Sequence, residues 1–161
     1  MSFLRFLMLL ALVVWIGGII FFAFVMAPTL FAVLPTTRLA GNVVNASLGK
    51  LHWMGLISGA IFLICSLGYN QLKHARAKPL AASHIFVVLM LLLTMASQFG
   101  ITPRMQVLRA NMEIGDLRVP FAAQRAEFDR LHEWSTRLEG GVLLLGLGVV
   151  ALTASRFGNS N

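Results

Sequence analysis

The charged residues of this chain are confined to short clusters, and long apolar runs separate the clusters. All acidic residues lie between Glu113 and Glu139, and the remaining charges are Lys and Arg. Four runs contain no Asp, Glu, Lys or Arg, at 6–37, 51–72, 79–103 and 140–155. A soluble domain of this length does not leave such stretches without alternating polar positions. The pattern therefore predicts four membrane spans.

The composition agrees with this interpretation. Of the 161 residues, 58% are hydrophobic and 12% are charged, whereas soluble domains average about 45–50% and about 25%. A helix crosses about 30 Å of hydrocarbon with about 20 residues, so four spans and their connections use nearly the whole chain. We predict an all-α integral membrane protein with a single domain, a four-transmembrane-helix bundle whose spans lie near 4–31, 51–70, 80–102 and 136–155.

The connections between the spans differ in length. The segment 34–49 is predicted to be a loop, and Pro28 before it is expected to kink or end the first helix. The long connection 103–135 is rich in helix formers on both sides of Gly115 and Pro120. Helices three and four are therefore expected to extend beyond the membrane and to turn near these two residues.

The net charge of +7 does not indicate a nucleic-acid partner, because the basic residues flank the spans and are not interleaved with aromatic residues. Membrane lipids with anionic headgroups are the expected partners. The sequence Gly55-x-x-x-Gly59 gives span two a face on which another helix can pack closely. We expect this face to contact a neighbour, either within the chain or in a homo-oligomer or another membrane protein.

An even number of spans puts both termini and the loop between spans two and three on one side of the membrane. This side carries bases and no acid, namely Arg5, Lys73, Arg76, Lys78 and Arg156. Lys and Arg in short loops mark the cytoplasmic side. The other side has more bases, but they are mixed with acids along a longer loop. We predict a multi-pass protein of a bacterial-type inner (plasma) membrane with both termini in the cytoplasm.

The fourth span begins with a stripe of functional side chains. Phe128, His132, Ser135 and Glu139 follow one another at intervals of four, three and four residues, so they share one helical face. The uncharged part of this helix, 140–155, is shorter than the roughly 20 residues that a span needs. Glu139 is therefore expected at or within the membrane boundary.

An acid at that depth is costly unless it faces the bundle interior and finds a partner, so it is a candidate functional site. The topology brings several polar residues to the same mouth of the bundle, and the candidate ligand-binding residues are His132, Glu139, Arg104, Ser135, His52 and Gln98, with Lys50 at the same level. A structural alternative stays open, in which an ion pair between Arg104 and Glu139 only ties the long connection down.

Metal chemistry has weak support in the sequence. There is no HExxH or CxxC motif, and Cys65 is the only cysteine. His52 and His132 are the only histidines at the predicted mouth, so they are the metal candidates. The eight Met residues would suit Cu(I), but they are scattered and are better explained by core packing. No catalytic residues are identified, and binding is favoured over enzymatic activity.

Several short motifs occur in a fixed order along the chain: Trp15-Ile16-Gly17-Gly18, Ala27-Pro28, Leu34-Pro35, Ala40-Gly41, Pro103-Arg104-Met105 and Phe128-x-Arg130-Leu131-His132-x-x-Ser135. In their order and placement relative to four spans they resemble the transmembrane protein 205-like family, also catalogued as a bacterial domain of unknown function. The resemblance implies a four-span membrane protein without an established reaction. It also marks Pro103, Arg104, His132 and Ser135 as family-pattern positions.

The helix order is more distantly similar to that of copper-resistance D proteins and of a four-span, haem-carrying protoporphyrinogen oxidase. That oxidase type places a His in span one, and this chain has none there. Three functional hypotheses follow. The first is a non-enzymatic protein that binds or helps move a small ligand or ion at the non-cytoplasmic mouth. The second is a haem- or copper-binding redox protein that uses His52 and His132, and the third is a structural or assembly partner.

Overall fold

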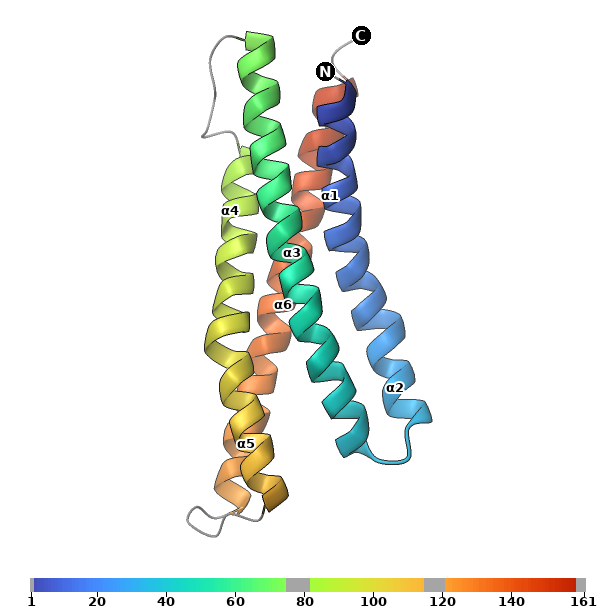
Figure 1. Cartoon of the computed structure of the whole chain (residues 1–161), viewed down its shortest axis with the longest axis vertical. Coiled ribbons are helices and arrows are strands. Elements are labelled where there is room, and N and C mark those ends of the chain that lie inside the picture. The colour runs from blue at the N-terminus through green and yellow to red at the C-terminus, as the bar shows by residue number, and fades with distance from the viewer. Residues whose placement is uncertain (1, 75–81, 115–120, 159–161) are drawn as a thin grey trace.

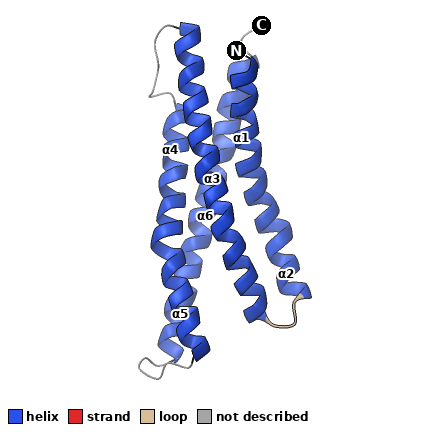
Figure 2. Ribbon diagram, viewed as in Figure 1, coloured by secondary structure: helices blue, strands red, loops and turns tan. Residues whose placement is uncertain are grey.

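The computed structural model describes residues 2–74, 82–114 and 121–158, and these residues form four long helical rods (Figure 1). No strand occurs in these three ranges (Figure 2). The rods consist, in chain order, of α1 (Ser2–Phe21) with the π-helix η1 (Phe22–Met26) and α2 (Ala27–Val33); α3 (Thr37–His74); α4 (Ala82–Met95) with the π-helix η2 (Ala96–Ile101) and α5 (Thr102–Ile114); and α6 (Phe121–Gly158).

Each rod is long and apolar enough to cross a membrane, over Ser2–Val33, Thr37–Gln71, Ala82–Met112 and Phe121–Ser155. Large apolar side chains cover the outside of the bundle; Ile64 and Leu144, for example, are 70% and 72% exposed. Helices that are apolar on all sides are typical of lipid surroundings. The predicted all-α, four-span bundle is therefore confirmed.

The interior of the bundle is made by facing pairs of helices. α1 packs along α3 and α4 packs along α6, while α3 also contacts α4. The largest fully buried side chains are Trp15, Phe62 and Met90, from α1, α3 and α4. The start of α1 and the end of α6 lie at the same end of the bundle (Figure 1), which we call the terminal end. We call the opposite end, where α2 leads into α3, the α2–α3 end.

The glycines of the Gly55-x-x-x-Gly59 sequence receive the indole ring of Trp15. A Cβ atom added at Gly55 would lie 2.4 Å from Trp15 Nε1, and one added at Gly59 would lie 2.7 Å from Trp15 Cζ3. Small residues thus permit close helix approach here. The neighbours of this face belong to the same chain: α1 through Trp15, and α4 through Leu91, which would lie 2.7 Å from a Cβ atom at Gly59. Association with a second protein through this face stays a prediction.

Each π-helix ends two residues before a proline, with Ala27 or Thr102 between them. Pro28 and Pro103 have no N–H to donate, and a proline ring in a regular α-helix clashes with the carbonyl one turn earlier. The wider turns relieve this conflict, because the N–H of Thr102 donates to Ser97 O and its hydroxyl donates to the same oxygen at 3.0 Å. The first helix does not end at Pro28, since α2 continues to Val33, but its regular α-helical geometry is interrupted by η1 just before this proline.

The prediction of a loop over 34–49 is wrong. Only 34–36 connect α2 to α3, and α3 begins at Thr37. Thr36 caps the helix, because its hydroxyl accepts the N–H of Leu39 at 3.2 Å and its carbonyl accepts the N–H of Ala40 at 3.1 Å. The apolar residues that follow are spaced as one helical face, at Ala40, Val44, Leu48 and Leu51. The scattered Asn and Ser residues conceal this spacing.

The predicted extension of helices three and four is confirmed. α5 continues the third rod to Ile114, and the first half of α6 packs against it. The connection between them, including Gly115 and Pro120, lies outside the described residues, as do Arg76 and Lys78 of the basic loop.

Candidate functional site

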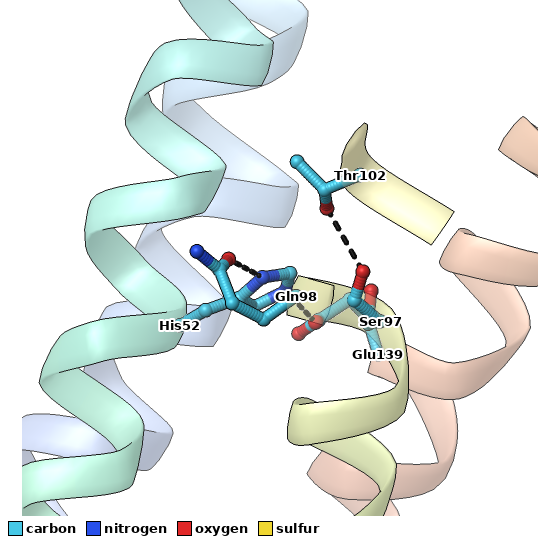
Figure 3. A network of polar contacts seen from close by, with 5 residues as sticks. All are labelled: His52, Ser97, Gln98, Thr102 and Glu139. Atoms are coloured by element: carbon cyan, nitrogen blue, oxygen red, sulfur yellow. Dashed lines mark hydrogen bonds and ion pairs between the residues drawn. The ribbon is translucent and has the colours of Figure 1, made fainter. Parts of the chain in front are cut away.

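Three polar side chains from three rods meet inside the bundle (Figure 3). His52 comes from α3, Gln98 from η2 and Glu139 from α6. His52 Nδ1 lies 2.8 Å from Gln98 Oε1, and His52 Nε2 lies 2.5 Å from Glu139 Oε1. The residue His52 is 2% exposed, whereas the Glu139 side chain is 17% exposed. We call these three residues the polar cluster.

The irregular third rod helps to position Gln98. A π-turn inserts an extra residue into the helix and shifts the phase of the side chains after it, and such turns are frequent at functional sites. Here the π-helix presents Ser97 to the interior, fully buried, and Gln98 toward His52. The same π-turn accommodates Pro103. Pro103 therefore influences the position of Gln98 through the backbone of the third rod.

Two tryptophans flank the polar cluster on the outer surface. Trp53 follows His52 directly and packs edge-on against Phe99, with ring centroids 6.0 Å apart. Trp134 lies five residues before Glu139, and both indoles are about half exposed. Exposed Trp rings gather at membrane–water boundaries. The polar cluster thus has the surroundings of a boundary position.

The contacts of the polar cluster fit two protonation states of His52. An imidazolium donates from both nitrogens and therefore satisfies both acceptor oxygens, one from Gln98 and one from Glu139. A neutral imidazole donates from one nitrogen only. A neutral ring agrees with these distances if the Gln98 side-chain amide is flipped, so that its NH2 group donates to the ring nitrogen that carries no hydrogen. Rotation of one amide is enough to exchange the two arrangements.

Buried hydroxyl groups extend from the polar cluster into the bundle. Thr94 and Ser97 are buried on the third rod, and their side-chain oxygens have no hydrogen-bond partner among the described residues. Ser135 is buried one turn from Glu139 on α6. Buried polar groups are usually satisfied, by protein or by water. The Thr94 and Ser97 hydroxyls are therefore positions where a water molecule or a small polar ligand would gain hydrogen bonds.

The structure brings together only part of the predicted site. His52, Gln98 and Glu139 are in contact, and Ser135 is buried beside them. Arg104 is exposed and pairs with Glu127 at 3.4 Å, so the alternative pair of Arg104 with Glu139 does not form. His132 is exposed and stacks on Phe128 with ring centroids 6.4 Å apart.

Of the candidate residues, His132 and Arg104 thus make their contacts away from Glu139, whereas His52 and Gln98 form the polar cluster with it. The reason is that a shared helical face does not imply a shared depth. Seven residues separate His132 from Glu139, which is a rise of about 10 Å. Along this extension α6 packs against α5, and His132 faces out of the bundle.

A polar pocket near the polar cluster was missed by the sequence analysis. Its volume is about 230 Å³, and it lies between α3 and α5, lined by Asn42, Asn45, Ala46, Gln106, Arg109 and Ala110. The Arg109 guanidinium donates to Asn42 Oδ1 at 2.8 Å. The expected loop over 34–49 concealed this pocket, because the spacing of Asn42 and Asn45 gains meaning only on a helix.

The two histidines named as metal candidates do not face each other. His132 is exposed, and both ring nitrogens of His52 already have partners within the chain. No group of three or more His, Cys, Asp or Glu side chains that could hold a metal occurs in the described ranges. Axial ligation by His52 would first have to break one of its two hydrogen bonds.

Comparison with protein families gives one match. The model described as a domain of unknown function, DUF4149, matches residues 10–113. This range covers more than half of the chain, and the chain belongs to this family. The match includes His52 and Gln98 but ends before Glu139. No curated protein and no solved structure matches the chain. The resemblances to the transmembrane protein 205-like family and to copper-resistance D proteins stay predictions.

Proposed function

We propose that this member of the DUF4149 family takes up and releases a proton at the polar cluster, as part of binding or moving a small ion or solute at the α2–α3 end. The proposal rests on the surroundings of His52. Its ring is buried in a transmembrane bundle, and each of its nitrogens faces a side-chain oxygen.

The energetic argument starts from the cost of such a group. A carboxylate and an imidazole inside a membrane protein are expensive to bury, and ionisable residues at such positions commonly mark ion or proton pathways. Gln98 can serve either charge state of the ring by turning its amide. The partial exposure of Glu139 gives a proton a route between the polar cluster and the surroundings.

The solute that would accompany the proton is small and polar. The pocket around Arg109 is about 230 Å³ in volume and has the amides of Asn42 and Gln106 in its wall. Seven residues separate Asn45 from His52 on α3, so the pocket lies about 10 Å farther along the bundle. A guanidinium beside amide groups suits a small solute that carries a carboxylate or another anionic group.

The location that accompanies this proposal is a bacterial-type inner membrane. Both termini lie in the cytoplasm in this assignment, since Arg5 and the bases near His74 are on the terminal side without acids. The polar cluster and the pocket then open on the non-cytoplasmic side. Proton release there would respond to the pH outside the cytoplasm.

The test is the protonation state of His52, measured by nitrogen-15 NMR of ring-labelled histidine in the chain reconstituted in lipid nanodiscs. Imidazole and imidazolium nitrogens have different chemical shifts, and His52→Gln identifies the resonance. We expect the His52 signal to change between the two states across the pH range in which the protein stays folded. Glu139→Gln is expected to displace this transition, and Glu133→Gln on the same helix is expected to leave it in place.

A constant His52 signal over the whole of that range would overturn the proposal. It would favour a second candidate function, that of a structural or assembly protein. One observation supports this candidate: the polar cluster ties α3, the third rod and α6 together. In that role the cluster needs only one protonation state. A partner protein would then bind elsewhere on the bundle, because Trp15 already fills the face of Gly55 and Gly59.

A further inference from the structure

An apolar groove runs along the lipid-facing side of α1 and α3, away from the polar pocket. Its volume is about 520 Å³, and its walls come from Leu10 and Val14 of α1 and from Trp53, Ile57 and Ile61 of α3. All five of these side chains are exposed. The groove is therefore open to whatever surrounds the bundle, and in a membrane protein this is lipid.

One end of the groove is charged. Lys50 lines the groove together with Trp53, three residues further along α3. The Lys50 side chain is exposed, and no described carboxylate forms an ion pair with it. Trp53 has the half-exposed position of a boundary indole. A cation at the boundary end of an apolar groove complements an acidic headgroup attached to a hydrocarbon chain.

The length of the groove matches one leaflet of a bilayer. Lys50 and Ile61 are eleven residues apart on one helix, which is a rise of about 16 Å. Half of the roughly 30 Å hydrocarbon core is about 15 Å. An acyl chain that begins at the level of Lys50 therefore reaches the middle of the membrane at the level of Ile61.

We propose that this groove is a binding site for one anionic phospholipid, with an acyl chain between α1 and α3 and the phosphate beside the Lys50 ammonium. The proposal is independent of proton binding, because the groove and His52 lie on different faces of α3. It names one bound lipid as a component of the protein, held more firmly than the lipids around the rest of the bundle.

The experiment uses the chain in nanodiscs of equal phosphatidylglycerol and phosphatidylcholine with identical acyl chains. After extraction in mild detergent, native mass spectrometry counts the lipids that stay bound. A basic residue near a membrane surface contributes about 1 kcal/mol toward anionic lipid, so we expect about fivefold more phosphatidylglycerol than phosphatidylcholine in the first retained lipid. Lys50→Gln is expected to abolish this preference.

Two pairs of variants separate the headgroup contact from the groove. Arg125→Gln removes an exposed base on α6 and is expected to keep the preference. Ile57→Trp fills the groove and is expected to reduce retention of both lipids, whereas Ile64→Trp, at a position 70% exposed outside the groove, is expected to leave retention unchanged. Soluble glycerol phosphate is not expected to displace the lipid.

The proposal fails if the unchanged chain retains the two lipids equally, or if Lys50→Gln keeps the preference. It also fails if Ile57→Trp and Ile64→Trp behave alike, since the groove would then hold no lipid. Displacement by glycerol phosphate would mean that the site recognises a free phosphate group without the acyl chain. Circular dichroism of each variant verifies that the helices are intact.

Discussion

Two carboxylates on α6, six residues apart, make side-chain contacts of nearly equal length in different surroundings. Glu133 lies 2.6 Å from Arg137, one turn away on the same helix, and its side chain is 61% exposed. Glu139 lies 2.5 Å from His52 of another rod, and its side chain is 17% exposed. The nitrogen–oxygen distance does not distinguish the two contacts. Burial distinguishes them.

The surroundings determine how much each contact contributes to the free energy of unfolding. An exposed pair at this helical spacing contributes about 0.3–0.5 kcal/mol, because water and salt screen it. A buried pair has lost its water, so removal of one partner leaves the other charge without compensation and commonly costs about 3–5 kcal/mol. The comparison predicts that equivalent substitutions at the exposed contact and at the enclosed contact have unequal effects on the free energy of unfolding.

The largest effect is expected from His52→Ala. The substitution leaves the largely enclosed Glu139 carboxylate and Gln98 amide without their common partner, and it opens a cavity where the buried ring was. We expect the free energy of unfolding to fall by about 3 kcal/mol, as measured by denaturant titration in mixed micelles. His132→Ala is the control, because that ring is exposed, and its effect is expected to stay within about 0.5 kcal/mol. Equal losses in the two variants would contradict the burial argument.

A smaller effect is expected from Glu139→Gln. Glutamine keeps the shape and can still form a hydrogen bond with His52, so the loss is limited to the charged character of the contact. We expect destabilisation of about 1 kcal/mol, seen as a lower Tm in the same detergent. The matched variant Glu133→Gln removes an exposed carboxylate and is expected to shift Tm by less than half as much. A larger shift from Glu133→Gln would reverse the ranking.

The smallest effect is expected from Arg125→Gln. Its guanidinium lies 3.2 Å from Asp129 one turn later, and both side chains are more than half exposed. The loss is expected to be at most about 0.5 kcal/mol, and it should fade at high salt, since about 1 M salt screens charges beyond about 3 Å. Salt should change the effect of His52→Ala much less. Thermal unfolding of both variants at low and high salt measures this difference.

The sequence predicted the parts of the site that depend on distance along the chain. The antiparallel order of spans predicted that His52 and Gln98 lie at the same level as Glu139, and the contacts of the polar cluster agree with this. The position of Glu139 at the membrane boundary, expected from the short uncharged stretch 140–155, stays a prediction. The prediction that His132 lies beside Glu139 was wrong. The stripe of Phe128, His132, Ser135 and Glu139 continues beyond the part of α6 that faces the bundle interior, and the His132 side chain is exposed. The prediction also failed over 34–49, where polar residues on the outer side of a helix look like a loop.

The sequence by itself determined that four helices cross a membrane and that the third and fourth extend beyond it, because charge exclusion from hydrocarbon acts on each segment separately. Only the tertiary structure decided which polar side chains meet. That choice depends on the rotation of each helix about its axis, and here the π-turn before Pro103 and the packing of Trp15 against Gly55 and Gly59 help to set it. Such rotations arise from contacts between segments. His52 therefore contacts Glu139, 87 residues away, only when the bundle is assembled.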